Sequence, residues 1–110
     1  MTLRQAQDGA DEGPWHLLIH TPGPNADPEV PFFEADWFPG HRGFHASLQA
    51  AGYFVAAGPL PERAGAGQTL VRGVSTEEIT RLATETDPAV AGGYLVVEIM
   101  PWRVVESILS

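Results

Sequence analysis

The order in which strand-like and helix-like segments follow one another is the strongest constraint on how this chain folds. Four short apolar segments have the composition of β-strands: residues 15–20, 53–57, 68–73 and 94–100. Two helical segments are predicted between them, starting near Pro39 and Ser75. The order strand–helix–strand–strand–helix–strand predicts an α+β fold, a ferredoxin-like βαββαβ sandwich in which both helices cover one face of the sheet.

The first predicted helix has a signal at each end. Pro39 is tolerated in a first helical turn, Asp36 is a candidate N-cap, and Gly52 suits the position after the last turn. One stripe of the helix is formed by residues that recur at helical spacing, namely His41, Phe44, Leu48 and Ala51. The spacing therefore puts a histidine on an otherwise apolar face.

The second predicted helix opens with Ser75-Thr-Glu-Glu78, the pattern of a capping box. In such a box the Ser75 hydroxyl accepts a hydrogen bond from the Glu78 backbone N–H, and the Glu78 side chain reaches back. We expect Glu77 to pair with Arg81 across one turn. The residues expected to be buried are Ile79, Leu82 and Ala83.

The last predicted strand is largely apolar on both faces. One face carries Leu95, Val97 and Ile99, and the other carries Tyr94, Val96, Glu98 and Met100. Two helices can cover only one face of the sheet, so the second face needs a partner. A homodimer joined sheet to sheet is the simplest arrangement that covers it.

Chain length and composition favour one folded domain. A chain of 110 residues with 44% hydrophobic content can build a single core. We place this domain at residues 14–110 and predict a flexible leader at residues 1–13, which is polar and acidic rather than a signal peptide. The absence of cysteine excludes disulfides, thiolate chemistry and cysteine-based metal sites, and a cytoplasmic location is expected.

The charge of the chain argues against two classes of partner. The formal net charge is −8, from 14 acidic residues against 6 basic ones. Binding of nucleic acid or of an anionic membrane surface needs clustered lysine or arginine, which this sequence lacks. No apolar run approaches the roughly 20 residues that span a bilayer. We therefore expect a small-molecule ligand, with no nucleic acid and no membrane as partner.

Histidine is the main candidate for chemistry, since imidazole is the side chain that normally titrates near neutral pH. The spacing alone does not show that His41 has a role in chemistry, because a buried histidine that bonds a backbone carbonyl would occupy the same position. Asp87 precedes a proline, so it could equally have a purely structural role as a helix N-cap. The aromatic residues Trp37, Phe38 and Phe44 near His41 could line an apolar ligand site or simply pack in the core.

Two pairs of histidines four residues apart, His41 with His45 and His16 with His20, raise the question of a metal. His41 with His45 could bind an ion through neighbouring helical turns, with Asp36 or Glu34 as a third ligand. The glutamate that follows the first histidine in zinc proteases is absent. Such pairs also arise by chance, so the prediction is that there is no metal and no cofactor.

The sequence resembles the YCII-related (YciI-like) family from Trp15 to Val105. The resemblance rests on His41-x10-Gly52, the strand Tyr53-Phe-Val-Ala-Ala-Gly58-Pro59-Leu60, a Gly-containing loop, the Ser-Thr-Glu-Glu helix start, Asp87-Pro88 followed by Gly92-Gly93, and a closing strand that ends in Met100-Pro101-Trp102. More distantly, the chain is similar to muconolactone-isomerase-like dimeric barrels. It differs from the shorter members in its Pro-rich loop at 21–31 and the aromatic stretch at 32–38.

This resemblance implies a dimeric α+β barrel with a catalytic pair formed by His41 and Asp87. A carboxylate that accepts from one ring N–H fixes the tautomer and leaves the other nitrogen to exchange a proton. Among the relatives of this family, a dehydrochlorinase-type activity on a chlorinated aromatic compound is known. The residues that we assign to substrate binding are His45, Phe44, Trp37, Gly58 and Pro59.

Two kinds of function remain open at this point. One is a small cofactor-independent lyase or isomerase that acts on an aromatic or cyclic compound. The other is a non-catalytic module that holds a small ligand in the dimer cleft, since a fold of this kind does not by itself imply a reaction.

Overall fold

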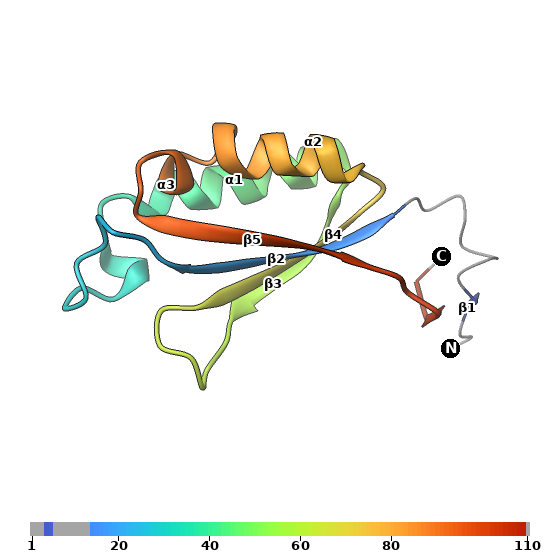
Figure 1. Ribbon diagram of the computed structural model, residues 1–110, viewed down its shortest axis with the longest axis horizontal. Helices are drawn as coiled ribbons and strands as arrows, with labels where there is room; N and C mark the ends of the chain where they lie inside the picture. The colour runs from blue at the N-terminus through green and yellow to red at the C-terminus, as the bar shows by residue number, and fades with distance from the viewer. Residues whose placement is uncertain (1–3, 6–13, 110) are drawn as a thin grey trace.

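An antiparallel sheet of four strands, in the order β3-β4-β2-β5, forms the centre of the molecule (Figure 1). Its strands are β2 (Trp15–Pro22), β3 (Phe54–Pro59), β4 (Gly67–Arg72) and β5 (Leu95–Trp102). All four predicted strands are therefore confirmed, with ends shifted by a few residues. Helices accompany this sheet, so the predicted α+β class is confirmed as well.

The computed structural model describes residues 4–5 and 14–109. The predicted leader lies outside the described residues except for β1 (Arg4–Gln5). This short strand pairs with β6 (Glu106–Ser107) and forms a second sheet of two strands. Within the described residues, no helix is long and apolar enough to cross a membrane.

The α-helices lie together on one side of the four-stranded sheet (Figure 1). They are α1 (Phe38–Ala51), α2 (Thr76–Arg81) and α3 (Pro88–Ala91). A π-helical turn, η3 (Leu82–Thr86), joins α2 to the residue that begins α3. Before α1 the aromatic stretch forms a short 3-10 turn, η2 (Phe32–Glu34).

The boundaries of α1 agree with the sequence at its end but not at its start. Gly52 follows the last turn with φ of 82°, a left-handed conformation that glycine adopts without strain. The prediction that Asp36 caps the helix is wrong, because Trp37 is the N-cap residue and no side chain makes a capping bond there. Instead, the Phe38 backbone N–H donates to the Ala35 carbonyl at 3.1 Å, so a backbone turn leads into the helix.

The start of α2 follows the predicted capping box in one of its two bonds. Ser75 Oγ accepts from the Glu78 backbone N–H at 3.1 Å. The Glu78 carboxylate is engaged by the Arg81 guanidinium, so the predicted pairing of Glu77 with Arg81 is wrong. Both partners are exposed, and an ion pair of this kind contributes little to stability.

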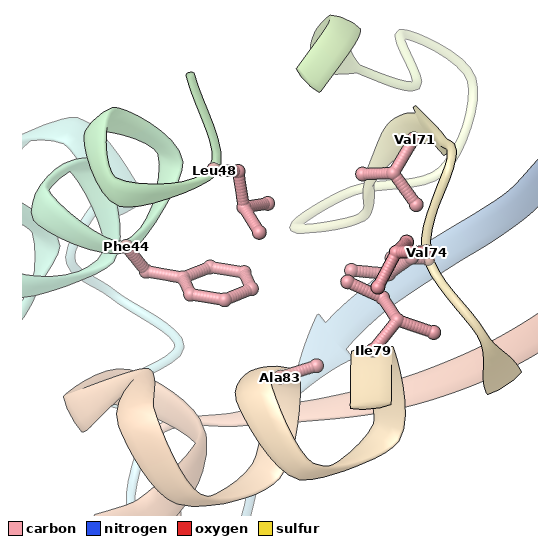
Figure 2. Close-up of a cluster of buried hydrophobic side chains, with 7 residues drawn as sticks. Phe44, Leu48, Val71, Val74, Ile79 and Ala83 are labelled. Carbon is pink, nitrogen blue, oxygen red and sulfur yellow. The ribbon is translucent and has the colours of Figure 1, made fainter. Parts of the chain in front are cut away.

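The core lies between α1, α2 and the helix-covered face of the sheet. Figure 2 shows Phe44 and Leu48 of α1 pointing toward Val71 of β4 and Ile79 of α2. The full buried cluster consists of Leu18, Phe44, Leu48, Val71, Val74, Ile79 and Ala83. Ala51, the last member of the predicted stripe, is exposed because the helix ends there.

The two faces of β5 differ as its alternating pattern predicts. Leu95 is buried, and Val97 and Ile99 pack against the core. Val96 is 50% exposed and Met100 is 40% exposed, on the face of the sheet opposite the helices. The described residues of one chain therefore leave large apolar side chains of this face in contact with water.

Candidate active site

A buried histidine–aspartate pair joins two elements that are far apart in the sequence. His41 lies in the first turns of α1, and Asp87 is the N-cap residue of α3. His41 Nδ1 and Asp87 Oδ2 are 2.7 Å apart, a short hydrogen-bond distance. His41 is 7% exposed and Asp87 is fully buried.

The two carboxylate oxygens of Asp87 have different partners. Oδ1 accepts from the Ala89 backbone N–H at 3.0 Å and caps α3, while Oδ2 faces His41. Asp87 is therefore both the cap that its sequence context suggests and a partner of the imidazole. Because an ionised carboxylate only accepts, His41 donates through Nδ1–H. This tautomer leaves Nε2 of His41 to exchange a proton with a bound molecule.

A third residue of the site is His20, which the sequence paired with His16 but did not assign to the site of His41. It lies in β2, with Nε2 3.8 Å from Asp87 Oδ2 and its ring centre 4.7 Å from that of His41. His20 is 3% exposed, and its Nε2 is a buried atom without a hydrogen-bond partner. Its sequence signal was weak: it follows Leu18 by two residues, which puts both on the core-facing side of the strand.

The other histidine of the same strand, His16, serves a different region. Its Nε2 is 2.7 Å from the Thr76 hydroxyl at the start of α2. Burial lowers the pKa of His16. The spacing of four residues between His16 and His20 therefore does not create a shared site.

His45 lies one turn after His41, and its ring centre is 4.4 Å from that of His41. Its Nε2 is 3.0 Å from the Thr69 hydroxyl of β4. Two imidazoles, His20 and His41, thus lie at the buried carboxylate and His45 lies beside His41, so proton transfer at one ring changes the charge felt by the others.

Burial sets the protonation of the two outer rings. It lowers the pKa of His20 to about 4, and the nearby His41 lowers it further while Asp87 opposes the shift. Burial likewise lowers the pKa of His45 to about 4, with further lowering from His41. Both rings are therefore neutral at neutral pH, and each has one donor and one acceptor nitrogen.

A cavity of about 440 Å³ opens beside these histidines. Among the residues predicted to touch substrate, His41, His45, Gly58 and Pro59 line it. The aromatic part of its wall comes from residues of η2, α1 and β3, namely Phe32, Phe33, Phe38 and Phe54. The sequence identified Phe38 as a possible lining residue, but it led to no functional prediction for Phe32 and Phe33.

Two predicted substrate-binding residues lie elsewhere. Phe44 belongs to the hydrophobic core and is 2% exposed, because its position on α1 faces the sheet (Figure 2). Trp37 is not part of the lining either; its ring stacks on Tyr94, with centroids 5.9 Å apart, and both line a second cavity. These two residues therefore do not line the cavity beside His41.

The residues that could hold a metal ion are His20, His41 and Asp87. Among the described residues, they form a group whose ligand atoms lie within 4.8 Å of one another. The third ligands considered in the sequence, Asp36 and Glu34, line the second cavity instead. Because Nδ1 of His41 is hydrogen bonded to Asp87, a histidine that keeps this bond has Nε2 left as its possible ligand atom.

The arrangement combines an oriented imidazole, a buried carboxylate and an apolar cavity large enough for a small molecule. These are the components needed for general acid–base chemistry on a bound compound. Comparison with protein-family models and with curated proteins found no match.

Proposed function

We propose that this protein is a small cofactor-independent enzyme, of the lyase or isomerase type, that acts on a small aromatic or cyclic compound. The observation that carries the proposal is the 2.7 Å hydrogen bond between His41 and Asp87 at the wall of the cavity. His41 is the general base and acid, and Asp87 orients its ring. His45, Gly58 and Pro59 contact the substrate.

The chemistry follows from the fixed tautomer. His41 Nε2 takes a proton from an acidic C–H of the substrate, and Asp87 stabilises the imidazolium that forms. The electron pair left on carbon either shifts a double bond or expels a leaving group. In an isomerisation the imidazolium returns its proton to another atom of the same compound. Positioned acid–base groups contribute roughly 10²- to 10⁴-fold in rate.

The proposal includes membership of the YCII-related family with a ferredoxin-like fold. Two observations support it. The strand order β3-β4-β2-β5 places the first and third strands of the βαββαβ pattern side by side at the centre of the sheet. The residues that carry the resemblance, His41 and Asp87, are hydrogen bonded although they are 46 positions apart. A cytoplasmic location, inferred from the absence of cysteine, completes this part of the proposal.

The proposed activity can be tested without knowing the reaction. In D₂O, a general base that removes a C–H proton exchanges it for deuterium, and NMR detects this loss in a library of cyclic and aromatic compounds. We expect His41→Gln to slow the exchange of any active compound by roughly 10²- to 10⁴-fold. His16→Gln is the matched control, because His16 is also buried but lies outside the cavity; it should keep the wild-type rate.

The alternative is a non-catalytic module that binds a small ligand in the same cavity. The apolar wall of the cavity favours it, because such a surface binds a ligand without any reaction. Failure of the wild-type protein to exchange any compound, together with equal ligand affinity in His41→Ala, would support this function and contradict the enzymatic one.

We further propose that two copies pair through the sheet face opposite the helices. The exposed side chains of Val96 and Met100 support this, since burying them in a dimer removes apolar surface from water. We expect the wild-type protein to sediment as a dimer at micromolar concentration, and the double variant Val96→Glu, Met100→Glu as a monomer. Gln49→Glu adds charge on exposed α1 and should remain dimeric; a monomeric wild type would contradict the proposal.

A further inference from the structure

The charge of the cavity lining is opposite to that of the chain. The protein carries 14 acidic residues and a formal net charge of −8. Among the described residues that line the cavity, none is aspartate or glutamate. The ionisable lining residues are Arg42 and three histidines, of which His20 and His45 are neutral at neutral pH, so Arg42 supplies the positive charge of the lining. Asp87 lies behind His41, fully buried, and is not part of the lining.

Arg42 is placed to meet a ligand at the mouth of this cavity. It follows His41 directly in α1, lines the cavity and is exposed, so its guanidinium is hydrated in the free protein and open to a ligand. Its charge reaches the interior of the site, because it contributes to the lowering of the pKa of His45. A guanidinium pairs with a carboxylate through two parallel N–H···O bonds.

The rest of the cavity wall indicates what the part of the ligand away from Arg42 is like. Phe32, Phe38 and Phe54 give an aromatic surface, and Phe33 extends it to the solvent, where it is 75% exposed. Flat rings pack against such side chains face to edge or in offset stacks. A volume of about 440 Å³ is in the range of cavities that hold ligands of one or two rings.

We propose that the cavity binds a small aromatic or cyclic anion, with its carboxylate or phenolate at Arg42 and its ring against the phenylalanines. The inference rests on the proposed function, because it names the substrate class of the same site. A cation would face Arg42 with no lining carboxylate to compensate it. A neutral ring would gain only the apolar contacts.

The test uses 2-naphthoate and its neutral counterpart 2-naphthamide, which share a ring system and differ in charge. Binding is measured by NMR titration at pH 7. We expect naphthoate to bind at least about fivefold more tightly than naphthamide, the gain of a partly exposed ion pair. Arg42→Gln should remove most of this difference and leave naphthamide binding unchanged. Arg103→Gln is the control. Leu95, at the start of β5, lines the cavity, whereas Arg103 comes directly after the other end of this strand and does not line it.

Equal affinities of the two probes in the wild-type protein would overturn the inference, as would no binding of either. Loss of the naphthoate preference in Arg103→Gln as strongly as in Arg42→Gln would overturn it too, because a general surface field would then be the cause. Failure of this inference can be told apart from failure of the proposed function, because binding and deuterium exchange are measured separately. A naphthoate preference that persists in His41→Gln, without deuterium exchange in the wild type, supports the ligand class and contradicts the enzyme.

Discussion

Asp87→Ala should lower the free energy of unfolding by about 1.5 to 5 kcal/mol, the largest effect expected of any single substitution at the site. The substitution removes the cap from Ala89 and leaves the buried Nδ1 of His41 without its partner. Loss of a cap costs about 0.5–2 kcal/mol, and an unpaired buried polar group about 1–3 kcal/mol. Urea unfolding followed by tryptophan fluorescence, at one fixed protein concentration, measures the change.

Asp87→Asn separates the two roles of this residue. The amide oxygen can still cap Ala89, so this variant should lose less stability than Asp87→Ala. Its amide nitrogen, however, donates to His41 and selects the wrong tautomer, so deuterium exchange should still fall. A stability of Asp87→Ala within about 0.5 kcal/mol of the wild type would show that the pair is not a structural element of the fold.

Acidification should destabilise the protein well before its carboxylates are protonated. In the folded state the pKa of His20 and that of His45 are each lowered to about 4, from the ordinary histidine value of 6.5 that applies in the unfolded chain. Between pH 6.5 and 4 the unfolded chain binds more protons than the folded one, so the free energy of unfolding falls as pH falls. The stabilisation is fully present above pH 6.5 and lost by about pH 4, on the order of 3 kcal/mol for His20 and less for the more exposed His45.

His20 should account for most of this loss, because it is the more deeply buried ring. His20→Gln cannot titrate, and its stability should therefore change less between pH 7 and pH 4 than that of the wild type. NMR titration gives a direct check: the ring proton shifts of His20 and His45 should stay at their neutral values down to about pH 5. Midpoints near 6.5 for both rings would contradict the burial argument.

The secondary structure followed from local rules in the sequence. Gly52 ends α1 because glycine tolerates the left-handed conformation, and Ser75 begins α2 because its hydroxyl bonds the Glu78 N–H. The alternation along β5 correctly separated its core-facing side chains from its exposed ones. Where two local partners were available, as for Arg81 with Glu77 or Glu78, spacing could not choose between them.

The candidate site was only partly accessible from sequence. Helical spacing put His41 on a buried stripe but allowed an ordinary core histidine; it was the family resemblance that singled out Asp87 as its partner. Sequence proximity to His41 also did not show that Phe44 packs in the core and that Trp37 lines the second cavity, because it does not say which way a side chain faces.

The sequence by itself determined the elements and the buried stripe that carries His41, because propensity, capping and periodicity act over a few residues. Only the tertiary structure decided that His20 joins the site and that Asp87 divides its oxygens between Ala89 and His41. These contacts depend on how α1 and α3 pack on the sheet, and pairs 46 positions apart leave no local pattern. The charge of the cavity is likewise a tertiary property, since a chain of net charge −8 folds so that no carboxylate of its described residues lines the cavity wall.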